Sequence, residues 1–232
     1  MAAAGFRHAL IVGAGSGLSA SLARAFHTEG MSVALAARNV AKLEASRAAG
    51  MHVFACDASD EAQVKRLFGD VEGATGAPDV VVYNASARAR GPFVDIAAAD
   101  VQRAFSVTAF GAFCVAQQAA RRMLPKGHGA ILFTGASASV KGYAQSAPFA
   151  MAKFALRGLA QSLARELSPK GIHVAHFVID GGIAQPGREA PSSAPDALLD
   201  PDAIAQTYLH VLRQPRSAWS WEVELRPWVE KF

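Results

Sequence analysis

Val12-Gly13-Ala14-Gly15-Ser16-Gly17-Leu18-Ser19 is the stretch that decides the fold of this chain. The apolar run 8–12 leads into it, and a helical pattern over 18–26 leaves it. In a strand, glycine turn and helix of this kind, the glycines let the backbone approach a phosphate and the helix N-terminus adds partial positive charge. The residues expected to bind the phosphates are Gly13, Gly15, Ser16, Gly17 and Leu18. Tight turns also use glycine for steric reasons alone, so the turn by itself leaves a purely structural role open.

The composition indicates a folded globular protein and excludes several classes of function. The chain has 232 residues, of which 51% are hydrophobic and 18% charged, which suits a single domain with a sizeable core. The net charge of +4 comes from scattered Lys and Arg, so we expect no nucleic-acid partner. No apolar stretch reaches the length of a membrane span, and the N-terminus lacks the pattern of a signal peptide. Two isolated cysteines, Cys56 and Cys114, favour a reducing compartment, so we expect a cytoplasmic protein.

Strands and helices are predicted to alternate along the whole chain. Apolar runs predict seven strands, at 8–12, 31–37, 51–55, 80–83, 130–134, 172–179 and 221–225. Helical patterns lie at 18–26, 40–49, 99–124, 147–167 and 201–214, and Ser59 is expected to cap a further helix. This order predicts an α/β fold, a Rossmann-type doubly wound parallel sheet in one domain over 1–232, with its ligand at the carboxyl ends of the strands. The tract 184–199 has no period and is expected to form a mobile substrate flap.

The end of the second strand indicates which dinucleotide would bind. A free ribose 2′-hydroxyl usually meets Asp or Glu at this place, whereas a 2′-phosphate needs a cation. The strand is followed by Arg38 and Asn39, with no acid. Arg38 is either a solvated surface residue or a bidentate phosphate ligand. Given the glycine turn, we favour phosphate binding, and hence NADP(H) over NAD(H).

These residues together resemble the short-chain dehydrogenase/reductase family over essentially the whole chain. The pattern Gly13-x-x-x-Gly17-x-Ser19 is similar to its glycine loop, with Val12 for the usual Thr and Ser19 for the last Gly. Asn84-Ala85 matches part of its N-N-A-G motif, in which Tyr83 and Ser86 do not match, and the ending 222–227 also looks like family members. The resemblance implies cofactor contacts from Asp57, Ala58, Asn84, Ala85 and Ile183, although Asp57 serves equally well as a turn residue.

The resemblance also indicates which positions would be catalytic, and at most of these positions the chain departs from the family. Lys153 matches the lysine that binds the nicotinamide ribose, but the catalytic Tyr, Ser and Asn positions hold Phe149, Ala136 and Thr108. Phenylalanine has no titratable proton, and loss of positioned acid–base catalysis costs about 10²–10⁴ in rate. Replacement hydroxyls are expected from Tyr143 and Ser137 beside Lys153, although a surface role for Tyr143 is favoured. Asp180 is either a titrating group near the nicotinamide or a plain turn residue.

Two functional hypotheses therefore remain from the sequence. The first is an NADP(H)-dependent oxidoreductase with a non-standard active site, acting on a carbonyl or alcohol or an activated double bond of a small molecule. The second is an NADP(H)-binding protein without turnover, acting as a sensor or a subunit partner. The pair His173-x-x-His176 points to opposite faces of a strand, so we expect no metal site. By resemblance we expect a homodimer or homotetramer built on the helices over 99–124 and 147–167.

Overall fold

Seven parallel strands form one sheet in the order β3-β2-β1-β4-β5-β6-β7. The structure is a computed structural model that describes residues 5–230. The strands are β1 (His8–Val12), β2 (Ser32–Ala37), β3 (His52–Ala55), β4 (Val80–Tyr83), β5 (Gly129–Thr134), β6 (Ile172–Ile179) and β7 (Glu222–Leu225). Every predicted strand is present to within one residue at either end, and the predicted doubly wound parallel α/β fold is confirmed.

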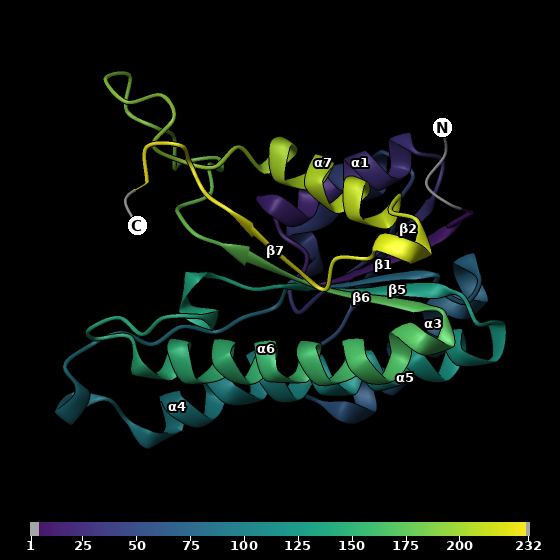
Figure 1. Cartoon of the computed structure of the whole chain (residues 1–232), viewed down its shortest axis with the longest axis horizontal. Coiled ribbons are helices and arrows are strands. Elements are labelled where there is room, and N and C mark those ends of the chain that lie inside the picture. The colour runs from purple at the N-terminus through teal and green to yellow at the C-terminus, as the bar shows by residue number, and fades with distance from the viewer. Residues whose placement is uncertain (1–4, 231–232) are drawn as a thin grey trace.

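Helices cover both faces of the sheet (Figure 1). Helices α1 (Leu18–Thr28) and α7 (Pro201–Leu212) pack on one face, while α3 (Glu61–Thr75), α5 (Gly111–Met123) and α6 (Ala147–Leu167) pack on the other. The strands alternate accordingly: Ile11 faces the first layer and Leu10 the second, and neither side chain is accessible to solvent. Because both faces are buried, the strands are continuously apolar rather than alternating with polar residues.

Local caps set several helix ends, one of them differently from expectation. Asn39 Oδ1 accepts a hydrogen bond from the Ala41 backbone nitrogen at 3.1 Å, but the predicted helix 40–49 divides into a 3-10 turn, Val40–Leu43, and the short helix α2, Glu44–Ala48. The prediction that Ser59 caps α3 is wrong. The cap is Asp60, because the Ser59 hydroxyl donates instead to Asp57 Oδ1 at 2.6 Å.

The predicted helix 99–124 is interrupted at its middle. Helix α4 (Ala98–Phe105) continues through a π-helical turn, Ser106–Phe110, into α5. The turn frees the Val107 carbonyl, which accepts a hydrogen bond from the Tyr83 hydroxyl. Thr108, in the same turn, is fully buried, and its hydroxyl accepts a hydrogen bond from the Ala87 backbone nitrogen at 3.2 Å. The turn therefore ties the end of β4 to the helix layer, as such irregularities do near functional sites.

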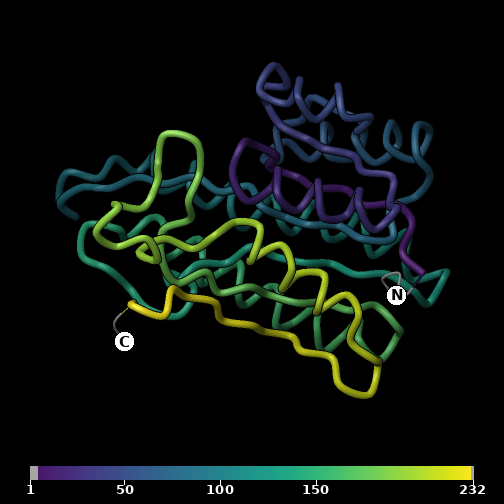
Figure 2. Tube along the Cα trace, turned by 90° about the horizontal axis from the view of Figure 1, so that it is seen from above, coloured from purple at the N-terminus to yellow at the C-terminus, as the bar shows by residue number. Residues whose placement is uncertain are grey.

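The segment 184–199 extends past the carboxyl ends of the strands (Figures 1 and 2). It contains no helix or strand, and two isolated bridges, Ile183–Leu199 and Gln185–Arg188, close its base and its first turn. It leads into α7, where Asp200 Oδ1 accepts a hydrogen bond from the Asp202 backbone nitrogen at 2.9 Å, as the Asp-Pro pair predicts. Within residues 5–230, no helix combines the length and the apolar character needed to cross a bilayer.

Candidate functional site

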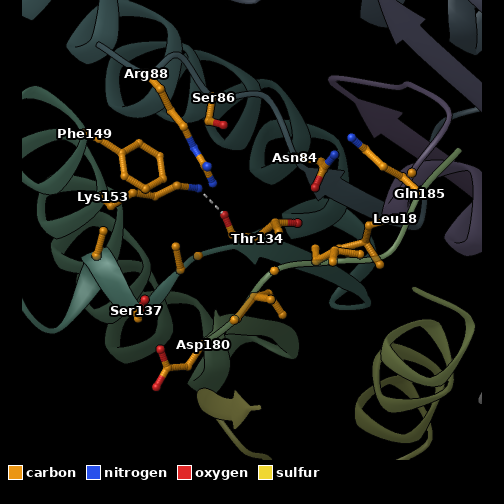
Figure 3. Close-up of a pocket in the computed structure, with 18 of the residues that line it drawn as sticks. Leu18, Asn84, Ser86, Arg88, Thr134, Ser137, Phe149, Lys153, Asp180 and Gln185 are labelled. Carbon is orange, nitrogen blue, oxygen red and sulfur yellow. Dashed lines mark hydrogen bonds between the residues drawn. The ribbon is translucent and has the colours of Figure 1, made fainter. Parts of the chain in front are cut away.

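A cleft of about 940 Å³ opens at the carboxyl ends of the strands. The glycine turn, the loops after β4, β5 and β6, and the start of α6 line it (Figure 3). Residues far apart in the sequence are therefore brought together where a parallel sheet places its ligand. The sequence-predicted site residues that line the cleft are Gly13, Gly15, Ser16, Gly17, Leu18, Asn84, Ser137, Tyr143, Lys153 and Ile183.

The glycine turn forms an open cradle of backbone at one end of this cleft. Gly13 has a φ of 88°, and a Cβ built on it would overlap the backbone nitrogen of Ala85, so no larger residue fits. Asn84 Nδ2 donates to the Gly13 carbonyl at 3.1 Å, and Ser19 Oγ accepts from the Gly15 backbone nitrogen at 2.8 Å. Helix α1 begins after Gly17 with no side-chain cap. The N–H groups at its start therefore remain available to an anion.

Four of the residues expected to bind the cofactor do not line the cleft. They are Arg38, Asp57, Ala58 and Ala85. Arg38 is exposed and, among the described residues, forms no ion pair; its charge contributes to a lowered pKa of Asp57, whose main cause is the hydrogen bonds from Ser59. Lys42, an exposed residue of the turn after β2, does line the cleft. Two cations thus stand near the end of β2 where sequence analysis predicted one.

Lys153 is buried in the site and, among residues 5–230, has no acidic partner. Its side chain projects from α6, is 3% exposed, and donates from Nζ to the Thr134 carbonyl at 2.6 Å (Figure 3). Burial, and to a smaller extent the charge of Arg88, lower the pKa of Lys153 from its ordinary value of 10.5 to about 7. At neutral pH this amine therefore exists in both protonation states, which an ordinary surface lysine does not.

Apolar side chains occupy the family's Tyr and Ser positions. Phe149 and Ala136 pack with Ala138 in a small cluster against the cleft. The Arg88 guanidinium lies over the Phe149 ring, with Cζ 4.4 Å from the ring centroid, and points toward Lys153 (Figure 3). The Phe149 ring therefore carries a cation on its face, an arrangement favoured by the ring quadrupole.

The other polar groups predicted near Lys153 differ in their surroundings. Ser137 lines the cleft, whereas Tyr143 is 45% exposed and its ring centroid lies 5.9 Å from Lys141 Nζ. Asp180 is buried, and its carboxylate pairs with Lys141 at 3.3 Å and with Arg226 at 3.4 Å. It lies at the opposite side of the site from Arg88 (Figure 3). The negative charge of Asp180 is therefore compensated by Lys141 and Arg226.

Sequence reasoning missed several cleft residues. They are Lys42, Ser86, Arg88, Arg90, Gln185, Arg188 and Glu230. Gln185 lies over the glycine turn, since a Cβ built on Gly17 would be 3.2 Å from its Oε1. The pair Arg88-x-Arg90 in the loop after the buried strand β4 was a local pattern that could have indicated a site. No local pattern pointed to Arg188, which only the fold brings to the cleft.

The two histidines of β6 have structural partners. His173 stacks on Trp219, with ring centroids 4.5 Å apart, and its Nε2 lies 2.9 Å from the Ser220 carbonyl. His176 Nδ1 lies 3.0 Å from Glu222 Oε2. Over the described range 5–230, no group of three His, Cys, Asp or Glu residues is placed to hold a metal ion. Both histidines therefore serve the packing of the sheet edge.

Comparison with known proteins agrees with this architecture. The family described as short chain dehydrogenase matches residues 7–189. A short-chain dehydrogenase from Rhodopseudomonas palustris has 33% identity and a TM-score of 0.82, over 96% of this chain and 99% of that one. The 3-oxoacyl-[acyl-carrier-protein] reductase MabA of Mycobacterium avium is 30% identical over 76% of this chain and 67% of its own length. An alcohol dehydrogenase of Thermococcus sibiricus complexed with 5-hydroxy-NADP shares the fold, with a TM-score of 0.85 at 23% identity over 97% of this chain and 98% of that one. The chain therefore belongs to the short chain dehydrogenase family, oxidoreductases that act on alcohol and carbonyl groups.

Proposed function

We propose that this protein is an NADP(H)-dependent oxidoreductase that interconverts a carbonyl compound and its alcohol with Lys153 as the proton donor. One observation carries the choice of cofactor: the end of β2 presents exposed Arg38 and Lys42, and no acid stands there to bind a free 2′-hydroxyl. An arginine guanidinium suits a phosphate because it offers two parallel N–H donors. The NADP analogue bound by the T. sibiricus alcohol dehydrogenase is consistent with this choice.

The residues of the cleft suit such a dinucleotide along its length. The backbone cradle at Gly13, where a side chain would overlap Ala85, leaves room for a pyrophosphate against the uncapped start of α1. Asp57 and Ala58 would contact the adenine. The nicotinamide end would meet the residues predicted to bind it, namely Asn84, Ala85, Lys153 and Ile183. When bound, the nicotinamide supplies or accepts the hydride, and the protein must provide the proton.

Lys153 is the group best placed to provide that proton. In the direction of reduction, a hydride adds to the carbonyl carbon and the oxygen takes a proton from the Lys153 ammonium, which becomes a neutral amine. Phe149 has no proton to give, and Tyr143 lies in the exposed outer loop. The lowered pKa of Lys153, about 7, suits a general acid at neutral pH. Ser137, which also lines the cleft, would help to orient the substrate oxygen.

The cofactor assignment is tested by calorimetric titration with NADPH and with NADH. We expect NADPH to bind more tightly, and Arg38→Ala to weaken NADPH binding about ten- to a hundredfold while leaving NADH binding unchanged. Arg47→Ala is the matched control, because Arg47 follows the same strand but pairs with Glu44 at 2.9 Å outside the cleft. Equal binding of the two nucleotides by the wild type, or equal losses in both variants, would contradict the assignment.

The proton donor is tested by the pH dependence of carbonyl reduction. We expect kcat/KM to fall as pH rises through the pKa of Lys153, and Tyr143→Phe to leave this profile in place. Phe149→Tyr should raise turnover, because it restores a hydroxyl at the position where the family carries its acid. If Tyr143→Phe abolishes turnover, the donor is Tyr143. Tight NADPH binding without oxidation across a broad carbonyl and enone panel would favour the alternative, a binding protein without turnover.

We also propose that the protein forms a homo-oligomer through the helices that flank the π-helical turn and through α6. Large apolar side chains are exposed on this layer, and exposed patches of this kind mark interaction surfaces. They are Phe105, Phe110, Phe113, Met151 and Phe154, each 42–54% exposed.

A cytoplasmic location completes the proposal. Cys56 and Cys114 are free and buried in the described structure. Burial is the main cause of the raised pKa of both thiols, so neither is poised for exchange. Two inert thiols suit a reducing compartment, and fluorescence microscopy of the tagged protein with compartment markers would test the location.

A further inference from the structure

Three arginines from two distant segments meet in the cleft beside Lys153. Arg88 and Arg90 belong to the loop after β4, and Arg188 belongs to the flap, defined here as residues 184–199; all three line the cleft. Burial lowers the pKa of Arg88, and the nearby charges of Arg90 and Arg188 lower it further. The Arg88 guanidinium therefore lies close enough to both Arg90 and Arg188 to feel their charges.

No acid in the described structure compensates this charge. Within residues 5–230, none of the three arginines forms an ion pair. The acids that line the cleft are Asp180, which already pairs with Lys141 and Arg226, and Glu230. Five basic residues line the same cleft, namely Lys42, Arg88, Arg90, Lys153 and Arg188. Basic residues thus outnumber the acids of the cleft, and such an excess of positive charge attracts an anion.

The loop that carries Arg88 and Arg90 is held at both ends. The Ala87 backbone nitrogen donates to Thr108 Oγ1 at 3.2 Å, and the Gly91 nitrogen donates to the Gln145 carbonyl at 3.1 Å. Between these anchors, Arg88 stacks on Phe149 and points into the site (Figure 3). A stacked guanidinium keeps its edge N–H donors free for a ligand. Arg88 is therefore positioned before any ligand arrives.

A tight turn of the flap positions Arg188. Gln185 and Arg188 exchange backbone hydrogen bonds of 3.0 and 2.8 Å around Pro186 and Gly187, and Gly187 has a φ of 79°. Proline followed by a glycine with positive φ is the pattern of a type II turn. The Arg188 side chain lies directly against Gly182, since a Cβ built on Gly182 would overlap Arg188 Nη2. The flap thus brings a cation back over the end of β6.

We propose that this arginine cluster, Arg88, Arg90 and Arg188, binds an anionic oxygen group on the substrate, so that the natural substrate is a carbonyl compound carrying a carboxylate or a phosphate. The inference rests on the proposed function, since it concerns the substrate of the same site. Arg88 lies over the Phe149 ring and its charge acts on Lys153, the proposed proton donor, while Arg188 reaches the end of β6 at Gly182. Carboxylate and phosphate both match the paired N–H donors of arginine.

A matched series of aldehydes tests the proposal in steady-state reduction with NADPH. The series is 4-carboxybenzaldehyde, 4-formylphenyl phosphate and the uncharged methyl 4-formylbenzoate. We expect kcat/KM for at least one of the two anions to exceed that for the ester by about tenfold or more, and Arg88→Gln to remove this preference. The better anion identifies the chemical class. Arg121→Gln, an exposed arginine of α5 outside the cleft, is the matched control and should keep the preference.

A binding measurement separates this inference from the proposed function. Benzoate and phenyl phosphate should raise the Tm of the wild-type protein, with and without NADP⁺, more than the neutral isostere benzamide does, and Arg88→Gln should lose that difference. This readout needs no turnover, so it stands even if the protein proves catalytically silent. Equal effects of benzamide and both anions would overturn the inference. A loss of NADPH affinity in Arg88→Gln as large as the loss of anion affinity would also overturn it, because the cluster would then hold the cofactor.

Discussion

Replacement of Lys153 by Met should remove a rise of protein stability with pH that the burial of the lysine causes. The folded pKa of this amine is about 7 against an ordinary value of 10.5. Between these values the unfolded chain binds more protons than the folded chain, so the free energy of unfolding of the wild type rises with pH. The slope approaches about 1.4 kcal/mol per pH unit, which amounts to roughly 2 kcal/mol between pH 7 and 9.

Lys153→Met removes this contribution and leaves an unbranched apolar side chain that is one heavy atom shorter. From pH 7 to pH 9 the wild type should gain roughly 2 kcal/mol of unfolding free energy that the variant does not gain. The value for the variant minus that for the wild type should therefore become more negative by this amount. The variant also leaves the Thr134 carbonyl without its donor, at a cost of about 1–3 kcal/mol. That cost is the same at each pH, so it shifts the difference without changing its slope.

Urea denaturation of both proteins without cofactor at pH 7, 8 and 9 measures the effect. Lys170→Met is the control, because Lys170 is exposed on the surface, 3.5 Å from Glu166, and this variant should parallel the wild type over the same range. A difference between Lys153→Met and wild type that stays constant within about 0.5 kcal/mol would refute the reasoning. The buried amine would then keep its charge throughout, and the argument for Lys153 as the proton donor would lose its basis.

Three further predictions concern the fold and the assembly. Gly13→Ala places a Cβ against Ala85 in a backbone of positive φ, so it should cost about 1–3 kcal/mol in urea denaturation and weaken NADPH binding in calorimetry. Glu222→Gln removes the negative charge and replaces one of the two carboxylate oxygens that accept from Arg157 at 2.6 and 2.8 Å by an NH2 donor, and should cost about 1–3 kcal/mol by the same denaturation assay. Phe113→Glu places a charge on the exposed apolar layer of α5, and light scattering should then give a smaller mass than the wild type while circular dichroism is unchanged.

The order of elements could be predicted because its determinants are local. A strand buried on both faces, such as β6, appears as an apolar run, and Asn39 and Asp200 cap neighbouring backbone groups within a few residues. The cap of α3 was missed because two cap residues are adjacent, and only the hydrogen bond from Ser59 to Asp57 decides between them. The π-helical turn was missed because its apolar pattern continues that of the flanking helices.

Some residues of the site could likewise be predicted from local motifs, whereas others are brought together only by the fold. The glycine turn and Lys153 could be identified by position, because each sits in a motif of fixed spacing. The arginine cluster could not, because Arg188 joins Arg88 only through the flap turn and the glycine at 182. Position-by-position comparison also treated Phe149 as a lost hydroxyl, and its ring turns out to carry the Arg88 guanidinium at 4.4 Å.

This arrangement couples the substrate's charge to the proton donor. Arg88 points toward Lys153 and its charge contributes to lowering the pKa of that amine, so an anion bound to Arg88 would offset the charge and raise the pKa again (Figure 3). An acidic substrate would thus hold its own proton donor in the charged form. The fall of kcat/KM with pH should begin at a higher pH for 4-carboxybenzaldehyde than for its methyl ester, as steady-state rates across pH 6–9 would measure. In Arg88→Gln the two profiles should coincide, since the charge that couples them is gone. Profiles that coincide in the wild type, with the acid still preferred, would mean that Arg88 binds the anion without influencing the proton at Lys153.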